Sequence, residues 1–187
     1  MTIMPYICII TGIMTKQGER ARIFSIRRAT VDDIDIIRHI AGIAFPATYS
    51  SIITEEQIAF MMDWMYGEEQ LRKELSSDTT YLLLEIDGET VGYVSFGPQD
   101  DNGLYHLHKI YLLPDYQGLG YGRELFVAAR AEMAALGARC FELNVNRQNK
   151  ALRFYLHMGM QIDRSGDFDI GGGFYMNDYI LKANLQE

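Results

Sequence analysis

The sequence predicts a single α/β domain, in which strands and amphipathic helices follow one another along the chain. One sign is residues 23–28, where apolar and polar side chains alternate as in a half-buried strand. A second is Asp87-Gly88, a strong hairpin signal between two apolar runs. A third is the apolar stripe of a helix over residues 122–136. The 187 residues, 48% of them hydrophobic, suffice for one globular domain with a proper core.

The individual elements follow from capping residues, periodicity and turns. Thr30 is a good N-cap, and the carboxylates of Asp32 and Asp33 suit the first turn of the helix that it opens. Residues 54–57, Thr-Glu-Glu-Gln, have the form of a capping box and predict a second helix. The other predicted elements are a helix over 68–75, strands 81–86, 90–96 and 104–112, a helix that Gly137 ends, and the last strands 139–145 and 173–182.

Residues 1–22 are expected to be an N-terminal extension of a single domain that comprises residues 23–187. The apolar run 7–10 follows no Lys or Arg and precedes no clear cleavage site, so it is a poor signal peptide. The extension either lies outside the fold, with Met14 as the true start of the protein, or adds a strand or a dimer contact. The last alternative would make the protein a homodimer.

Composition narrows the classes of partner. The formal net charge of −8 argues against nucleic acid and against an anionic membrane surface, and it mildly favours a cationic substrate. No apolar run approaches the roughly 18 residues of a membrane span. Cys8 and Cys140 are far apart in sequence and indicate no disulfide framework. Since free thiols fit a reducing compartment, we expect a cytoplasmic protein.

The most informative segment of the chain is residues 109–123. It reads as an apolar strand, a short turn, and then Gly118, Gly120 and Gly122 at alternate positions opening a helix. Glycine lets the main chain approach a ligand closely, and the first turn of a helix offers unpaired N–H groups and a partial positive charge. The segment therefore suits the phosphates of a cofactor, unless its glycines serve only to make a tight turn.

Two common phosphate-binding motifs fit this segment poorly. A P-loop requires a Gly-Lys-Ser/Thr end, which the sequence lacks. A dinucleotide site requires Gly-x-Gly-x-x-Gly; Glu142 could pose as its ribose-binding acid, but too little chain remains for the other strands and helices. A dinucleotide-dependent enzyme is therefore a poor alternative. What remains is a Gln-x-x-Gly-x-Gly pattern, formed by Gln117, Gly120 and Gly122, after a strand that ends in Leu-x-Pro.

This pattern resembles motif A of the GNAT N-acetyltransferases. The resemblance continues downstream, where Leu-x-Val-x-x-x-Asn is followed by Ala-x-x-Phe-Tyr and then by Gly-Met. The two blocks span residues 104–160, and Met160 stands where the family usually has Phe. The helical insert near 54–75 and the Asn-Asp-Tyr ending at 177–179 resemble the polyamine N-acetyltransferase branch more loosely.

The resemblance implies a GNAT-like mixed sheet of about six to seven strands, mostly antiparallel and twisted, flanked by helices and with splayed central strands. It also implies an acetyl-CoA-dependent N-acetyltransferase, an acyltransferase that uses no metal. The loop would bind the diphosphate of acetyl-CoA, and the strand before it would pair with pantetheine and supply a main-chain oxyanion donor. The implied cofactor-binding residues are Ile110, Tyr111, Leu112, Gln117, Gly118, Leu119, Gly120, Tyr121, Gly122 and Asn149.

Tyr155 and His106 are the candidate catalytic residues. Tyr155 stands where a family member would donate to the leaving thiolate, although a core aromatic is the alternative. Asn149 is equally explained as an ordinary helix N-cap. His106 stands roughly where some members place a carboxylate base, and an imidazole of pKa about 6.5 can accept a proton at pH 7. His106 and His108 could also be ordinary residues of a half-exposed strand, and no third ligand at a recognisable spacing makes them a metal site.

The acceptor is predicted to be a primary amine: a polyamine or other small amine first, and a peptide substrate, meaning a protein N-terminus or lysine, second. Specificity should come from residues 45–75 and 97–103. The carboxylates there either flank a cationic amine or form the solvated side of helices; they are Glu55, Glu56, Asp63, Glu68 and Glu69. A non-catalytic sensor that binds acyl-CoA is the alternative function, against which Tyr155 and the glycine loop speak together.

Overall fold

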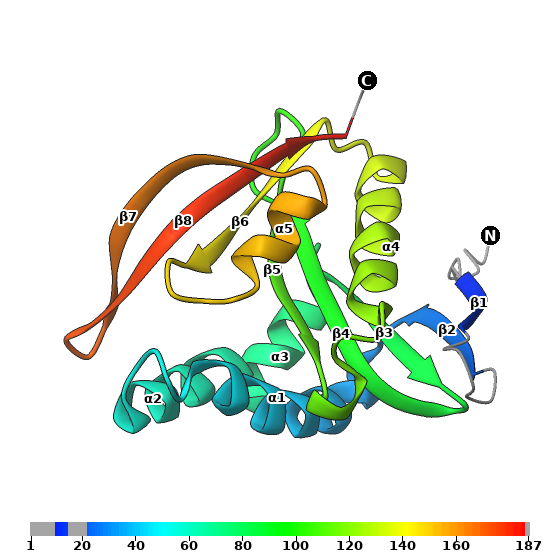
Figure 1. Ribbon diagram of the computed structural model, residues 1–187, viewed down its shortest axis with the longest axis horizontal. Helices are drawn as coiled ribbons and strands as arrows, with labels where there is room; N and C mark the ends of the chain where they lie inside the picture. The colour runs from blue at the N-terminus through cyan, green and yellow to red at the C-terminus, as the bar shows by residue number, and fades with distance from the viewer. Residues whose placement is uncertain (1–9, 15–21, 186–187) are drawn as a thin grey trace.

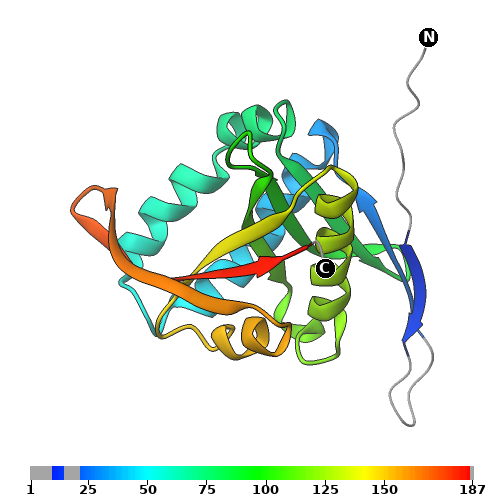
Figure 2. The same ribbon diagram turned by 90° about the horizontal axis from the view of Figure 1, so that it is seen from above.

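The computed structural model describes residues 10–14 and 22–185, which form one eight-stranded sheet with helices on both faces (Figures 1 and 2). The strand order is β1-β2-β3-β4-β5-β6-β8-β7, and β5 and β6 are the one parallel pair among these neighbours. The strands are β1 (Ile10–Met14), β2 (Arg22–Arg28), β3 (Thr80–Ile86), β4 (Glu89–Pro98), β5 (Leu104–Leu112), β6 (Cys140–Asn146), β7 (Gln161–Gly171) and β8 (Phe174–Asn184). The helices are α1 (Ile34–Tyr49), α2 (Glu55–Tyr66), α3 (Glu68–Leu75), α4 (Tyr121–Ala135) and α5 (Leu152–His157).

This architecture confirms the predicted fold class and adds two strands to those predicted along the chain. β1 is antiparallel to β2: Ile10 pairs with Ile26 at one end, and Met14 pairs with Arg22 at the other. β1 is therefore the added strand that was one of the alternatives for the N-terminal extension. Residues 1–9, which include Cys8, and residues 15–21 lie outside the described residues. β7 escaped prediction because nearly all of its side chains are exposed, and because Arg164 and Gly166 interrupt the apolar alternation of Ile162, Phe168 and Ile170.

The predicted capping residues begin the helices as expected. Thr30 caps the short 3-10 turn Val31–Asp33 that leads into α1: its hydroxyl accepts from Asp32 N at 3.3 Å, and the Asp33 carboxylate accepts from Thr30 N at 2.8 Å. Thr54 opens α2 by accepting from Gln57 N at 3.2 Å. These bonds satisfy N–H groups that no helical carbonyl can reach.

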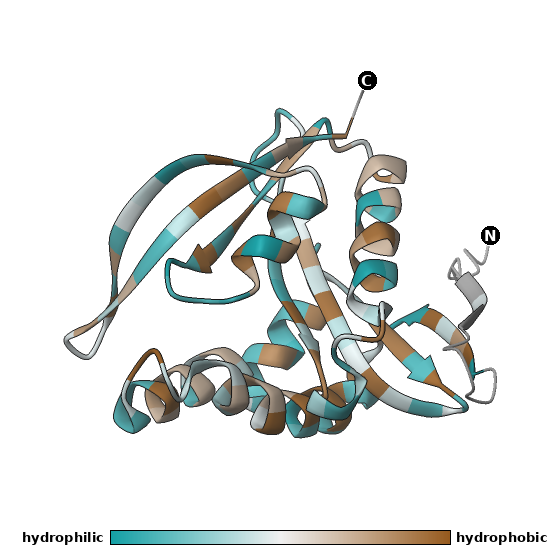
Figure 3. Cartoon of the chain, in the orientation of Figure 1, coloured by the Kyte–Doolittle hydropathy of each residue, from teal (hydrophilic) through white to brown (hydrophobic). Residues whose placement is uncertain are grey.

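The sheet separates two apolar cores. One lies under α4 and α5 and includes Leu125, Phe126 and Phe141, all of them inaccessible to solvent. The other lies under α1, α2 and α3 and includes Ile37 and Ile40. Figure 3 shows hydrophobic residues recurring along β4, in the sheet between the helical layers, and along α4, while β7 is largely hydrophilic. The central strands are stabilised by apolar contacts on both faces, whereas β7, at the edge of the sheet, carries polar side chains.

The parallel pair opens after three residues. Its registered partners are Leu104–Cys140, Tyr105–Phe141 and His106–Glu142, and beyond these the two strands diverge (Figure 1). On its other side, β5 stays paired with β4 as far as Leu112. A bulge interrupts that ladder at His108, because Ser95 pairs with Lys109 while Phe96 pairs with Leu107. The structure thus confirms the predicted splay of the central strands.

Candidate functional site

One edge of β5 is open next to the splay. Leu113 N donates to Val91 O at 2.9 Å, which fixes the phase of the antiparallel ladder with β4. In such a ladder, hydrogen-bonded and non-hydrogen-bonded residue pairs alternate. The N–H and C=O groups of Ile110 and Leu112 therefore point away from β4 and into the opening. Tyr111 was also expected to pair with pantetheine, but its N–H and C=O groups point to Tyr93 in β4.

The glycine loop lies at the end of this edge. It follows the 3-10 turn Pro114–Tyr116 and contains Gly118 and Gly120. Their φ angles are 72° and 94°, a backbone conformation that residues with a side chain rarely adopt. Gly120 is the N-cap of α4, so the first-turn N–H groups of that helix face the loop. Gln117 turns its side-chain amide back and donates to Leu112 O at 3.0 Å. The loop and the open edge therefore form one continuous main-chain surface.

Tyr155 lies in the apolar core beside the opening. It is 7% exposed and packs between Phe126 and Phe154, at ring-centroid distances of 6.1 and 5.3 Å. Burial, and secondly the neighbouring Tyr49, raise the pKa of Tyr155 well above that of a free tyrosine. The hydroxyl therefore stays protonated at neutral pH and can act as a hydrogen-bond donor.

Asn149 connects the start of α5 to α1. Its Oδ1 accepts from Ala151 N at 2.9 Å and closes a local side-chain turn. The N-cap of α5 is Ala151, so Asn149 lies two residues before the helix cap that it was predicted to be. Its Nδ2 lies 3.5 Å from the Tyr49 hydroxyl, at the end of α1. Asn149 thus links the α5 turn, which positions Tyr155, to the opposite face of the sheet.

His106 lies at the closed end of the opening, next to His108. Its Nδ1 lies 3.2 Å from Gln99 Oε1, and the two imidazole centroids are 5.0 Å apart. The Gln99 amide donates from Nε2 to the Glu142 carboxylate at 3.0 Å, which orients its oxygen toward the imidazole. His106 therefore carries its proton on Nδ1 and keeps the Nε2 lone pair. Burial lowers the pKa of His106, and burial with the charge of His106 lowers the pKa of His108 to about 4.

Glu142 has a structural role that sequence reasoning did not assign. It is 3% exposed and accepts from Arg164 Nη2 at 3.1 and 3.2 Å as well as from Gln99. A buried carboxylate requires hydrogen-bond donors or a cationic partner. The ion pair with Arg164 connects β6 to β7. Since its oxygens are engaged by protein donors, Glu142 does not behave as a free ribose-binding acid.

Tyrosines line the face of the sheet that α1 and α2 cover. Tyr93 donates to Tyr66 at 3.0 Å, and the rings of Tyr93 and Tyr111 are 5.9 Å apart. Tyr49 stacks on Phe45 at 4.6 Å. The sequence placed residues 45–75 near the acceptor and Tyr111 at the cofactor. It did not predict that these tyrosines converge, because their convergence depends on strand register. The five carboxylates of this region, Glu55, Glu56, Asp63, Glu68 and Glu69, are all exposed, as solvated helix faces are.

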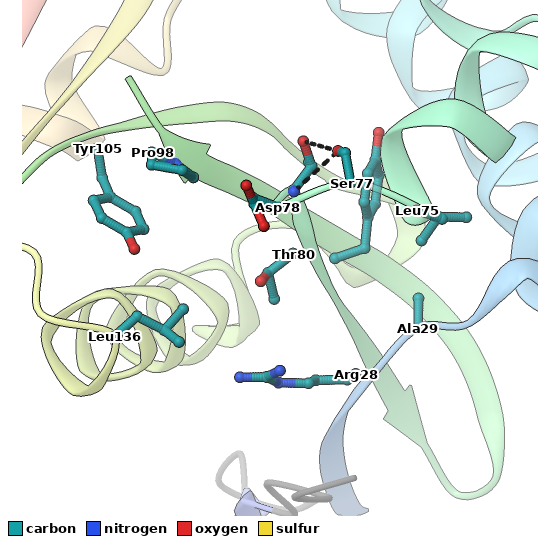
Figure 4. Close-up of a pocket in the computed structure, with 11 residues that line it drawn as sticks. Arg28, Ala29, Leu75, Ser77, Asp78, Thr80, Pro98, Tyr105 and Leu136 are labelled. Carbon is teal, nitrogen blue, oxygen red and sulfur yellow. Dashed lines mark hydrogen bonds between the residues drawn. The ribbon is translucent and has the colours of Figure 1, made fainter. Parts of the chain in front are cut away.

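A cavity of about 390 Å³ lies elsewhere, between the ends of β2 and α4 and the start of β3 (Figure 4). Arg28, Thr80 and Tyr105 point into it, and Arg28 is paired with Glu132. None of the predicted site residues lines it. Within the described residues, no group of three or more His, Cys, Asp or Glu is arranged to hold a metal, and no helix is long and apolar enough to cross a membrane.

Comparison with known proteins identifies the family to which this site belongs. The profile of the acetyltransferase (GNAT) family matches residues 45–160. An uncharacterized N-acetyltransferase of Mycobacterium tuberculosis is 31% identical over 155 residues, which cover 82% of this chain and 98% of that protein. The spermidine N(1)-acetyltransferase of Thermoplasma acidophilum is 25% identical over 150 residues, 77% of this chain and 92% of that enzyme.

Solved structures share the fold. The PaiA N-acetyltransferase of Thermoplasma acidophilum, in complex with coenzyme A, superposes with a TM-score of 0.74 at 24% identity, covering 86% of this chain and 98% of that one. YncA of Salmonella typhimurium, solved with acetyl-CoA, gives a TM-score of 0.64 at 22% identity, with 88% and 95% covered. The splayed strands, the glycine loop and the sequence relatives agree with one another. The chain belongs to the GNAT family of acetyl-CoA-dependent N-acetyltransferases.

Proposed function

We propose that the protein transfers an acetyl group from acetyl-CoA to a primary amine by direct attack in a ternary complex. The observation that carries this proposal is the open edge of β5, which leads without interruption into the glycine loop. An extended amide chain can pair with such an edge as an added strand does. Pantetheine has two amides, and the diphosphate that follows it suits a helix N-terminus.

The cofactor would be bound largely by main-chain groups. Pantetheine pairs with Ile110 and Leu112, whose N–H and C=O groups face the opening. The ring of Tyr111 packs against Phe45 and Tyr93 and would contact the cofactor from the α1 side of the sheet. The diphosphate is bound by the main chain of Gln117, Gly118, Leu119, Gly120, Tyr121 and Gly122. Asn149 lies at the far side of the opening, within reach of the cofactor through Nδ2. In this proposal the side chain of Gln117 shapes the loop, because its amide donates to Leu112 O.

Two groups would stabilise the charge that develops during transfer. The N–H of Ile110, two residues after the bulge at His108, is the candidate oxyanion donor. Tyr155 would donate a hydrogen bond to the leaving thiolate. A tyrosine of pKa about 10 or higher and a thiol of about 8.5 make full proton transfer uphill by about 2 kcal/mol or more, so donation without full transfer is the favoured role.

His106 is the candidate acceptor of the amine proton, directly or through water. Its Nε2 lone pair is available, since Nδ1 carries the proton that faces Gln99. The lowered pKa keeps the imidazole neutral at pH 7, but it also makes the imidazole a weaker base. A lysine-like amine of pKa about 10.4 costs about 4.6 kcal/mol to deprotonate at pH 7, so the base matters most for such acceptors.

A polyamine or another small amine is the proposed acceptor, and a protein N-terminus or lysine is the second choice. The net charge of −8 and the relationship to a spermidine N(1)-acetyltransferase support a cationic amine. The proposal takes residues 23–187 as the catalytic domain. It places the protein in the cytoplasm, in keeping with the free thiol of Cys140.

The test is release of free CoA thiol from acetyl-CoA in the presence of an amine panel. The panel contains spermidine, lysine, and peptides with a free N-terminus. Amine-dependent release of thiol is expected. Binding of acetyl-CoA without turnover on any amine would support the sensor alternative. Thermal stabilisation by NAD but not by CoA would contradict the proposal altogether.

A further inference from the structure

Asp178 is a buried carboxylate with a free acceptor atom. It lies in β8 opposite Asn146 of β6 and is 5% exposed. Its Oδ2 accepts from Asn144 Nδ2 at 3.3 Å, while Oδ1 has no hydrogen-bond partner among the residues that the structure describes. Buried polar atoms are almost always paired, so this oxygen calls for a functional explanation.

Among the described residues, the cation that acts on this carboxylate is already engaged elsewhere. It is Arg147, whose guanidinium is paired with Asp167 and also donates to Gly166 O. Burial raises the pKa of Asp178, against smaller opposing effects of Asn144 and Arg147. Its charged form is therefore under-stabilised, and a cation brought by a ligand would correct this.

Asp178 faces the acceptor side of the sheet. Side chains alternate along β8, so Asp178 shares its face with Met176, which packs into the core under α1 and α2. Tyr49, at the end of α1, is close enough to Asp178 that burial and this charge together raise the pKa of Tyr49. Tyr49 is in turn the electrostatic neighbour of Tyr155 and the hydrogen-bond partner of Asn149. Tyr49 therefore connects Asp178 to the point where the thioester would react.

The carboxylate lies one side chain below the surface. Asn144, the residue that covers Oδ2, is itself exposed, and its bond to Asp178 is long at 3.3 Å. Displacing such a bond costs little compared with the charge-assisted bonds that an ammonium group would form. An amine that pushes the Asn144 amide aside can therefore reach both oxygens.

We propose that Asp178 binds the ammonium group of the acceptor and selects cationic primary amines, an inference that rests on the proposed acetyl transfer. An ammonium group offers three donors, which match the free Oδ1 and the weakly held Oδ2. Asp178 contributes binding and orientation in this arrangement. His106 pairs with Glu142, four residues along β6 from the position opposite Asp178, or about 13 Å. It therefore keeps the role of proton acceptor through water.

The first test is a split between KM and kcat. Asp178→Asn should raise the KM for the preferred amine about 10- to 100-fold, as loss of a hydrogen bond to a charged group does. It should leave kcat within about threefold and the KM for acetyl-CoA unchanged. Asp169→Asn removes the same charge from an exposed position on β7 and should change the amine KM by less than about twofold. An unchanged amine KM in Asp178→Asn would overturn the inference.

The second test measures binding without turnover. Calorimetric titration of the CoA-loaded full chain with each amine of the panel should show binding to the wild type and a loss of about tenfold or more in Asp178→Asn. Asn144→Ala should bind at least as tightly as the wild type. Binding lost in Asp178→Asn supports the inference even if no amine is acetylated, a result that would refute only the proposed function. Equal binding by both proteins, or no binding by the wild type, would overturn it.

Discussion

The side-chain amide of Gln117 donates to the main-chain oxygen of Leu112 at 3.0 Å, and this bond ties the glycine loop to the open edge of β5. A loop held in this way presents its N–H groups in a fixed position relative to the strand. Preorganised donors bind an anion without an ordering cost at the moment of binding. We therefore expect the loop to determine affinity for the cofactor.

Gly120→Val should abolish acetyl-CoA binding. A valine at φ 94° is strained, and its side chain would project where the phosphates bind. Gly137→Val is the matched control, because Gly137 has φ 92° just beyond the other end of α4 and faces open space. Both variants carry the same kind of strain, so titration calorimetry should show binding lost in the first and retained in the second. Equal binding by the two would remove the loop from the cofactor site.

Tyr155→Phe should lower kcat about 10- to 1,000-fold and leave the Kd for acetyl-CoA within a few-fold, because the hydroxyl acts on the leaving thiolate. Phenylalanine keeps the ring that packs against Phe126 and Phe154, so the melting temperature should change little. Tyr105→Phe, on the half-exposed start of β5, is the control and should retain full turnover. Stopped-flow measurement of thiol release reports the step directly. Full activity in Tyr155→Phe would leave the residue with a purely structural role.

Glu74→Gln should destabilise the fold by about 3–5 kcal/mol at pH 7, since it leaves a buried lysine unpaired. Lys109 Nζ lies 2.6 Å from Glu74 Oε2 and 2.8 Å from the Tyr81 hydroxyl, and Lys109 is 7% exposed. Denaturant unfolding would measure the loss. The double variant Glu74→Gln/Lys109→Met should recover much of it, because no buried charge remains.

The stability difference between wild type and Glu74→Gln should depend on pH. Burial raises the pKa of Glu74, but the charge and hydrogen bonds of Lys109 outweigh burial and lower it overall. The folded state therefore holds this proton less tightly than the unfolded state does. The stabilisation is fully present above the ordinary pKa of 4.5 and is lost as pH falls through the lowered folded value. A difference that persists unchanged at low pH would contradict the ion pair.

Asp178→Asn should stabilise the protein by about 0.5–2 kcal/mol at pH 7.5, although it impairs the site. Burial raises the pKa of Asp178 in the folded state, so folding favours the protonated form. The penalty is fully present above the raised value and disappears as pH falls toward the ordinary 3.8. Asp178→Asn should therefore melt at a higher temperature than the wild type at pH 7.5. Near pH 4 the two melting temperatures should converge. Asp101→Asn, in an exposed turn, is the charge-matched control.

The sequence predicted the features that depend on local chemistry. The capping bonds of Thr30 and Thr54, the hairpin at Asp87-Gly88 and the left-handed glycine that opens α4 all follow from residues near one another in the chain. The family resemblance then supplied the splay, because divergence of two strands has no local signature. The family and fold are confirmed, and the roles of the individual site residues stay predictions.

Features that depend on register were outside the reach of the sequence. Tyr111 faces β4 with its main-chain groups because of the ladder phase that Leu113 and Val91 fix, which no pattern in the chain reveals. Asp178 becomes notable once β8 pairs with β6 and buries it, which leaves Oδ1 without a hydrogen-bond partner among the described residues. The polar strand β7 shows the converse: it pairs with the edge of β8, although Arg164 and Gly166 break the apolar alternation of its own sequence.

The most direct measurement is a crystal structure of the full chain with coenzyme A. We expect the diphosphate within hydrogen-bond distance of main-chain nitrogens of residues 117–122, and pantetheine between β5 and β6 against Ile110 and Leu112. A diphosphate bound anywhere else, for example beside Arg28 in the cavity of Figure 4, would contradict it.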